Sequence, residues 1–251
     1  MPPPQYVPSI SIPYQFTCSI KMEPIAFDCL VHHICQFQQS IPANVTTIAV
    51  TKQASVEQMR AAYAAGLRHF GESRVQEAAQ KQAELVDLQD VTWHFIGHLQ
   101  SNKVAKALEL FQWIHSVDNL KLAERIDRLA LPLAHPPQLC LQVKLRSDPN
   151  KSGWSIEQLL ADLPQLNQLQ HVRIAGLMVI PPLGLSESEL CQFFRQARDL
   201  ANVVNQQAWS RLHLQELSMG MSDDYQLAIA SGATMIRPGQ ILFGARSSRV
   251  S

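Results

Sequence analysis

The chain has 251 residues, of which 46% are hydrophobic, and its formal net charge is zero. This hydrophobic content is enough for a sizeable core, and the length fits one or two domains, or one domain if the fold is a barrel. The neutral charge gives no electrostatic basis for binding nucleic acid or an anionic membrane. No apolar stretch reaches membrane-spanning length, and the five cysteines form no Cys-x-x-Cys pair. We therefore expect a cytoplasmic protein with reduced thiols, and neither nucleic acid nor a membrane as partner.

The first residues differ in composition from the rest of the chain. Residues 1–21 hold five prolines and show no helical period, and Pro13 interrupts their apolar part. No basic residue precedes Lys21, so the segment lacks the basic start and unbroken apolar core of a signal peptide. We expect residues 1–24 to be a disordered tail, or to lie upstream of a true start near Met22, and residues 25–251 to form one domain.

Beyond the tail, short apolar runs rich in β-branched and aromatic residues alternate with segments of helical periodicity. The expected strands are 47–52, 69–73, 93–97, 113–117, 139–145, 174–180, 216–220 and 233–237. The expected helices are 25–39, 55–66, 75–86, 101–110, 118–130, one starting at 155, 186–207 and 222–230, with Ser55, Ser101, Asp118 or Asn119, and Ser222 among their caps.

Eight strand–helix alternations in about 200 residues are typical of a single (β/α)8 barrel. A doubly wound open sheet is the alternative fold. That sheet usually carries a Gly-x-Gly-x-x-Gly turn after its first strand, whereas Lys52 stands there in this chain. The sequence therefore favours the barrel.

Lys52 is the first candidate functional residue. It ends the apolar run that begins at Thr47, at the strand edge where barrels carry their active sites. A buried ammonium is costly, so such a lysine either reaches water or loses its proton. A neutral lysine is a nucleophile that forms imines with aldehydes. Taken alone, a lysine at the end of a strand is far more often simply exposed, and it is the later segments of the chain that favour a functional role for Lys52.

The segments after the seventh and eighth expected strands are the second candidate. Residues 218–222 lead through Gly220 into an expected helix, and Arg237, Gly239 and Gln240 follow the eighth strand. In barrels the loops after these two strands often cradle a phosphate. A lysine nucleophile on the first strand together with such a cradle is the layout that pyridoxal 5′-phosphate requires.

Other conspicuous residues give weaker evidence of a functional site. His94, His98 and His115 have no carboxylate partner at metal-ligand spacing, so no metal is expected. Residues 151–154 are either a basic lip for an anion or an ordinary solvated loop. The pair Phe193–Phe194 is expected in the core.

Five segments, in order, resemble the pyridoxal phosphate homeostasis protein family: 49–52, 70–77, 93–103, 176–178 and 217–223. The resemblance runs from about residue 25 to Arg246, and residues 237–244 are also similar to the phosphate and pyridine contacts of the alanine racemase barrel. It implies an alanine-racemase N-terminal-domain type barrel that binds pyridoxal 5′-phosphate in vitamin B6 and amino-acid homeostasis without enzymatic turnover. The expected partners are the cofactor, free amino acids and pyridoxal phosphate-dependent apoenzymes, and the expected state is a monomer.

The resemblance also implies roles for individual residues. Lys52 would hold the cofactor as an internal aldimine, and Arg237 would face the pyridine nitrogen. Most family members have Asn in place of Ser73, near the cofactor's 3′-oxygen, and many have Ser or Thr in place of Gln240. The implied phosphate contacts are Ser218, Gly220, Ser222, Gly239 and the backbone amide of Gln240.

Two other functions fit the same fold. A pyridoxal phosphate-dependent racemase or decarboxylase would need a second acid or base, which in such enzymes is a tyrosine from an added β-domain. Outside the tail, this chain has only Tyr63 and Tyr225, both in expected helices. A sugar-phosphate isomerase or aldolase using Lys52 would need a carboxylate or lysine partner, and none is evident at the expected barrel mouth.

Overall fold

The computed structural model describes residues 27–146, 148 and 151–244. The strands in these ranges are β1 (Thr46–Val50), β2 (His69–Glu72), β3 (Thr92–Phe95), β4 (Trp113–Val117), β5 (Gln138–Gln142), β6 (Arg173–Met178), β7 (Glu216–Ser218) and β8 (Met235–Ile236). The helices there are α1 (Phe27–Gln39), α2 (Val56–Ala64), α3 (Val75–Glu84), the 3-10 helix η1 (Ser101–Lys103), α4 (Val104–Leu110), α5 (Leu120–Ala130), α6 (Ile156–Leu166), α7 (Glu187–Asn205), α8 (Tyr225–Ala230) and α9 (Gln240–Phe243).

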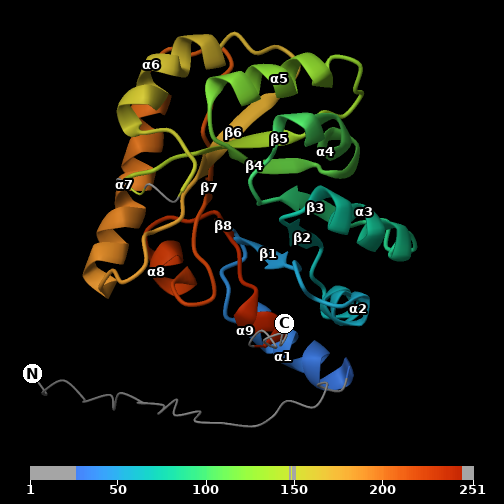
Figure 1. Cartoon of the computed structure of the whole chain (residues 1–251). Coiled ribbons are helices and arrows are strands. Elements are labelled where there is room, and N and C mark those ends of the chain that lie inside the picture. Colours follow the sequence, from blue (N-terminus) through green and yellow to red (C-terminus); the bar gives the residue numbers. More distant parts are fainter. Residues whose placement is uncertain (1–26, 147, 149–150, 245–251) are drawn as a thin grey trace, which may run out of the picture.

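The eight strands pair in chain order and close into a barrel, with the helices outside it (Figure 1). Every pairing is parallel, and β1 closes on β8 with Thr46 opposite Met235. The expected (β/α)8 barrel is therefore confirmed, because a doubly wound sheet would leave two strand edges unpaired. The tail expected over residues 1–24 lies outside the described residues.

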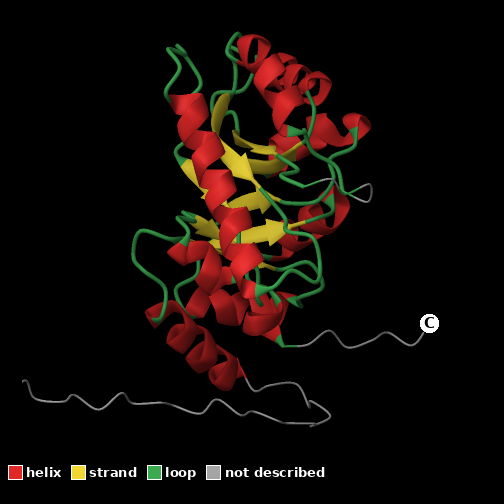
Figure 2. Ribbon diagram, turned by 90° about the vertical axis from the view of Figure 1, so that its left-hand side faces the viewer, coloured by secondary structure: helices red, strands yellow, loops and turns green. Residues whose placement is uncertain are grey.

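Strand alternation divides the apolar residues between two layers. Ile48 of β1 packs with Trp113, Cys140 and Met235 in a small cluster drawn from strands around the barrel, so this cluster fills the interior. Ala49 belongs instead to the large cluster of buried residues. That cluster draws its members from the strands and from the helices, which surround the strands in Figure 2. Successive side chains of a strand face opposite sides, so the inward positions of β1 are those of even number.

Several helices begin as the sequence predicts. The hydroxyls of Ser55, Ser155 and Ser186 each accept a hydrogen bond from the backbone N–H three residues on, which forms a capping box in each case. Asn119 caps α5 through its side-chain oxygen, which accepts from the backbone N–H of Leu122 at 2.9 Å. The predicted core pair Phe193–Phe194 is buried on α7, as expected.

Two predicted caps are wrong. Ser101 begins the short helix η1, and α4 follows from Val104 without a side-chain cap. Ser222 lies three residues before α8, and its hydroxyl accepts hydrogen bonds from the loop after β8 instead of from its own helix. The turn before α8 is closed by Asp224, whose carboxylate accepts from the backbone N–H of Met221 at 2.6 Å. The helix therefore starts later than the sequence suggests.

The strands β6 and β7 approach very closely at Gly176. A Cβ placed on Gly176 would lie 1.9 Å from the backbone oxygen of Glu216, which is its partner in the sheet register. Only glycine fits there.

Among the helices of the described ranges, none combines the length and the apolarity that a membrane crossing requires.

Candidate cofactor site

Lys52 lies in the turn between β1 and α2, two residues beyond the end of the strand, and its side chain is partly exposed. The peptide groups on both sides of it are held by residues from α3. The carbonyl oxygen of Thr51 accepts a hydrogen bond from Lys81 Nζ at 2.7 Å, and the backbone N–H of Gln53 donates to Glu77 Oε1 at 3.1 Å. Gln53 has a φ of 75°, a left-handed conformation that non-glycine residues seldom adopt.

The Lys81 ammonium is fully hydrogen-bonded. Besides the Thr51 carbonyl, Lys81 Nζ donates to Glu72 Oε1 at 2.9 Å and to Glu77 Oε1 at 2.8 Å. The Thr51 hydroxyl also donates to Glu72 Oε1, at 2.7 Å. Burial raises the pKa of Glu72, while the hydrogen bonds from Thr51 and Lys81 oppose that rise. We call Thr51, Glu72, Glu77 and Lys81 the Lys81 cluster.

The loops after β7 and β8 are joined through Ser222. Its Oγ accepts from the backbone N–H groups of Gly239 and Ile241, each at 3.2 Å. The backbone N–H of Arg237 donates to the carbonyl of Gly220 at 2.8 Å, which ties the two loops together a second time. Ser222, Gly220 and Gly239, three of the residues predicted to bind phosphate, therefore lie close together.

The loop after β8 also lies against the strand that leads to Lys52. The backbone N–H of Val50 donates to the carbonyl of Pro238 at 2.8 Å. A Cβ on Gly239 would come within 3.2 Å of the Val50 side chain, so glycine permits this approach. The structure thus brings the segment carrying Lys52 and the predicted phosphate loop to the same end of the barrel.

Arg237 is buried inside the barrel together with Ser218. Its guanidinium donates from Nη1 to Ser218 Oγ at 2.7 Å and from Nη2 to the carbonyl of Val179 at 3.0 Å. Burial lowers the pKa of Arg237 to about 10, while Asp224 opposes the shift. The guanidinium therefore stays charged at neutral pH, and it can only donate hydrogen bonds.

A row of three histidines crosses the barrel interior from β2 to β4. His69 Nδ1 lies 2.9 Å from His94 Nε2, His94 Nδ1 lies 2.9 Å from His115 Nε2, and His115 Nδ1 lies 2.8 Å from Ser218 Oγ. We call these three residues the histidine chain. Burial lowers the pKa of His115 to about 3, and burial also lowers the pKa of His94 and of His69. All three rings are therefore neutral at pH 7.

The links of the histidine chain depend on one another, because each neutral ring carries a single N–H. The Ser218 hydroxyl accepts from Arg237 Nη1 and has its own hydrogen and a second lone pair left for His115 Nδ1. Where Ser218 donates, the rings carry their protons on Nε2; where it accepts, they carry them on Nδ1.

The other predicted site residues lie around this centre. Ser73 follows β2 and lines a pocket of about 190 Å³ with residues that include Phe95, His98 and Lys103. Gln240 begins α9 with an exposed side chain. In the loop over residues 151–154, Lys151 Nζ donates to the carbonyl of Pro181 at 2.6 Å, so it is tied to the segment after β6.

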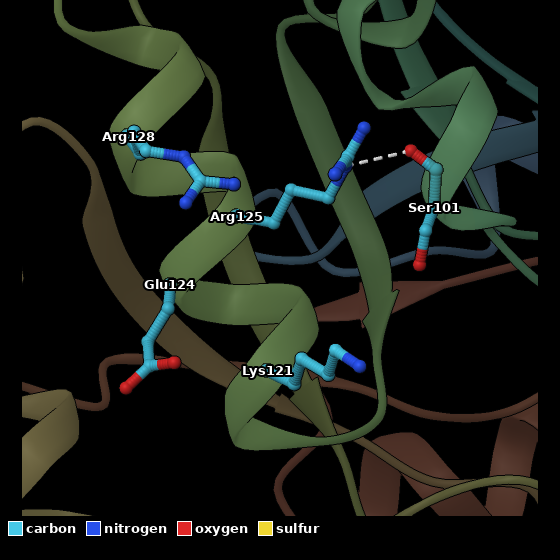
Figure 3. Close-up of a pocket in the computed structure, with 5 residues that line it drawn as sticks. All are labelled: Ser101, Lys121, Glu124, Arg125 and Arg128. Atoms are coloured by element: carbon cyan, nitrogen blue, oxygen red, sulfur yellow. Dashed lines mark hydrogen bonds between the residues drawn. The ribbon is translucent and has the colours of Figure 1, made fainter.

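A larger pocket, of about 430 Å³, lies at the helices outside the barrel and contains none of the predicted site residues. Figure 3 shows Arg125 of α5 reaching toward Ser101, whose carbonyl accepts from its Nε at 2.8 Å. The lining is completed by Lys121, Glu124 and Arg128, also of α5. It is therefore separate from the candidate site.

Across the ranges 27–146, 148 and 151–244, no group of three or more His, Cys, Asp or Glu side chains is placed to hold a metal ion.

Sequence reasoning missed Lys81 and the roles of Glu72 and Glu77. On α3, Glu77 and Lys81 are four residues apart, a spacing that usually indicates an exposed helical ion pair. The one available signal was Glu72, a carboxylate in an expected buried strand, which requires a cation nearby.

Comparison with known proteins places the fold in a class. A sequence profile described as "Alanine racemase, N-terminal domain" matches residues 25–247. An alanine racemase of Corynebacterium glutamicum, 14% identical, superposes with a TM-score of 0.69 over 90% of this chain and 64% of that one, a likeness of fold alone. The closed barrel with a lysine after its first strand is therefore of the alanine racemase N-terminal type.

Closer relatives give the family. A pyridoxal phosphate homeostasis protein of Synechocystis sp. is 54% identical over 82% of this chain and 94% of that one. Another, of Pseudomonas aeruginosa, is 46% identical over 82% of this chain and 86% of that one. PipY of Synechococcus elongatus, solved with PLP bound, is 55% identical, with a TM-score of 0.82 over 86% of this chain and 100% of that one. The chain belongs to the pyridoxal phosphate homeostasis protein family.

Proposed function

We propose that this chain binds pyridoxal 5′-phosphate at the carboxyl-terminal mouth of its barrel and acts in the homeostasis of that cofactor and of amino acids. The observation that carries the proposal is the convergence at one barrel end of Lys52, the Ser222–Gly239 link and the buried guanidinium of Arg237. The relative PipY, solved with PLP bound, supports the same ligand.

The residues present fit this ligand by their chemistry. Ser222 accepts two backbone N–H groups, so its own hydroxyl hydrogen remains for an anion. The close approach of Gly239 to Val50 brings the start of α9 beside the strand that leads to Lys52, and the N–H of Gln240, the first residue of that helix, has no partner within the helix. Arg237 supplies a buried positive charge that suits a ligand carrying a phosphate dianion.

We assign the individual roles as follows. Lys52 is the attachment point, and the buried Arg237 faces the ring nitrogen. When bound, the cofactor supplies an aldehyde that condenses with a neutral lysine amine and releases water. Ser73 lies beside the ring at the edge of the neighbouring pocket. The phosphate contacts are Ser218, Gly220, Ser222, Gly239 and the backbone of Gln240.

Two features support binding without classical turnover. Arg237 has no acceptor atom and keeps its charge, so a ring nitrogen facing it stays unprotonated and withdraws electrons weakly. Within the described residues, the tyrosines are engaged elsewhere: Tyr63 donates to Asp90 on the surface, and Tyr225 packs against Phe37. Neither is placed as a second acid or base beside Lys52.

On this proposal the protein exchanges its cofactor with free amino acids or other amines, or delivers it to pyridoxal phosphate-dependent apoenzymes. We propose that it works as a monomer in the cytoplasm. The described cysteines are all free thiols, which is consistent with a reducing compartment.

The test is direct. The purified protein should show a visible absorbance band from bound cofactor, and borohydride reduction followed by peptide mapping should place the label on Lys52. Lys52→Ala should lose the band while keeping the barrel folded, whereas Lys144→Ala, a control on the segment after β5, should keep it. A label on Lys103, Lys144 or Lys151 instead would overturn the assignment.

The rate of alanine racemisation distinguishes the racemase alternative from the proposed function. If the loaded protein racemises alanine at roughly 1 per second or faster, an ordinary enzymatic rate, it is a catalyst and the proposed lack of turnover is wrong.

A further inference from the structure

The backbone around Lys52 is held more firmly than a surface turn requires. Lys81 binds the carbonyl immediately before Lys52, and Glu77 binds the N–H immediately after it, at 2.7 Å and 3.1 Å. Both residues come from α3, a helix that follows the next strand. The Lys52 peptide is therefore held by a neighbouring β/α unit in addition to its own turn, in which the Ala54 N–H donates to the Thr51 carbonyl at 2.8 Å.

The turn that is held is also a strained one. Gln53 adopts a φ of 75°, which costs a non-glycine residue free energy and persists only where surrounding contacts impose it. Two contacts impose it: the hydrogen bond that closes the turn, from the Ala54 N–H to the Thr51 carbonyl at 2.8 Å, and the hydrogen bond from the Gln53 N–H to Glu77. Strain of this kind next to a candidate nucleophile is commonly part of how a site is prearranged.

The Lys81 cluster is built to stay in place. The three N–H donors of the Lys81 ammonium all have acceptors, and Lys81 and Glu72 are both buried. Separating the partners of a buried ion pair leaves an uncompensated charge in the interior, which is strongly destabilising. The two side chains are therefore held in contact. Glu72 Oε2 has no hydrogen-bond partner among the described residues, although the carboxyl is completely buried. The Lys81–Glu72 pair therefore costs desolvation free energy. A buried ion pair of this kind can serve to fix the geometry of its surroundings.

We propose that Lys81, Glu72 and Glu77 are positioning residues that hold the Lys52 peptide so that its amine faces the barrel mouth. This inference rests on the proposed function, in which Lys52 is the attachment point. In this role the three residues act through the backbone of Thr51 and Gln53, to which Lys81 and Glu77 are hydrogen-bonded.

The decisive comparison uses two substitutions at one position. Glu77→Gln keeps an oxygen that accepts from Gln53, and covalent attachment of added pyridoxal phosphate should stay within about threefold of wild type. Glu77→Leu removes the acceptor, and the attachment rate should fall roughly tenfold to a hundredfold, the usual effect of a small misplacement of a reacting group. A Gln53→Gly change in the Glu77→Leu background should restore much of the rate, because glycine adopts a positive φ without strain.

A second measurement needs no cofactor. Reductive methylation of the apoprotein with formaldehyde, followed over pH by peptide mapping, reports the pKa of the Lys52 amine. In Lys81→Met the carboxylate of Glu77 loses its cation next to Lys52, so the apparent pKa of Lys52 should rise and its methylation at neutral pH should slow. Lys106→Met removes an exposed Lys–Glu pair at 2.6 Å and is the control that should change nothing.

The outcomes separate this proposal from the proposed function. If folded Glu77→Leu attaches cofactor as fast as wild type, or if Gln53→Gly gives no rescue, the positioning role is wrong although Lys52 still binds. If wild-type Lys52 takes no label at all, the proposed function itself fails, while the methylation profile still tests the cluster. Should Lys81→Met not fold, the Glu77 and Gln53 variants decide alone.

Discussion

Acid should destabilise this protein through the histidine chain, and the effect can be calculated for His115. Its pKa is lowered from 6.5 to about 3, chiefly by burial and also by Arg237. The unfolded chain therefore takes up a proton on this ring below pH 6.5, whereas the folded chain stays neutral until about pH 3. Stability present above pH 6.5 is lost progressively as the pH falls through this window.

The size of the loss follows from the same shift. Between pH 7 and pH 5, His115 alone should lower the free energy of unfolding by about 2 kcal/mol, and His94 should add to this because its pKa is also lowered. Urea unfolding at the two pH values measures the total. Other groups titrate as well, so a variant is needed to isolate His115.

His115→Gln keeps an amide that can donate and accept but does not titrate in this range. The variant will be less stable at pH 7, but its loss between pH 7 and pH 5 should be smaller than that of wild type by about 2 kcal/mol. His135→Gln, at an exposed site, is the control that should keep the wild-type pH dependence. If wild type and His115→Gln lose the same stability to within about 0.5 kcal/mol, the reasoning on burial and charge is refuted.

Three further outcomes are expected. Gly176→Ala should cost about 3 kcal/mol in urea unfolding, because its Cβ would meet the Glu216 carbonyl oxygen at 1.9 Å; a smaller cost would mean that β6 and β7 can separate. Ser186→Ala should lower the unfolding free energy by about 1 kcal/mol through loss of the α7 capping box, and an unchanged unfolding free energy would mean that the cap does not stabilise the helix. Nitrogen-15 NMR should find all three rings of the histidine chain protonated on the same nitrogen, because each link needs one donor and one acceptor, and rings with different tautomers would contradict the chain.

The barrel could be predicted because each of its elements leaves a local signal. The run from Thr46 to Val50 is apolar and β-branched, and Ser55 begins the next helix with a capping box, so strand and helix are both legible without tertiary information. The same two signals recur along the chain. The placement of Lys52 at the mouth followed from this repetition together with the resemblance.

The polar interior could not be predicted, because it depends on which way a residue faces. His69, His94 and His115 are separated by 25 and 21 residues and belong to three strands. Strand boundaries read from sequence are uncertain by one or two residues, and a shift of one residue turns every side chain to the opposite face. The same limit applies to Lys81, whose spacing from Glu77 is that of an exposed helical pair although it points under the β1–α2 turn.

The Lys81 cluster and Arg237 lie at the same end of the barrel but differ in how their charges are compensated. The Lys81 cluster joins two carboxyl groups to one ammonium, and its hydrogen bonds are directed at the backbone beside Lys52. Arg237 is a buried cation that is fixed by two neutral oxygens, those of Ser218 and Val179. Because neutral oxygens do not offset its charge, the interior near Arg237 favours an anionic ligand, whereas the carboxylates near Lys52 are already engaged with Lys81. On the proposed roles, a ligand with an aldehyde for Lys52, a ring nitrogen for Arg237 and a phosphate for the Ser222–Gly239 link fits this mouth.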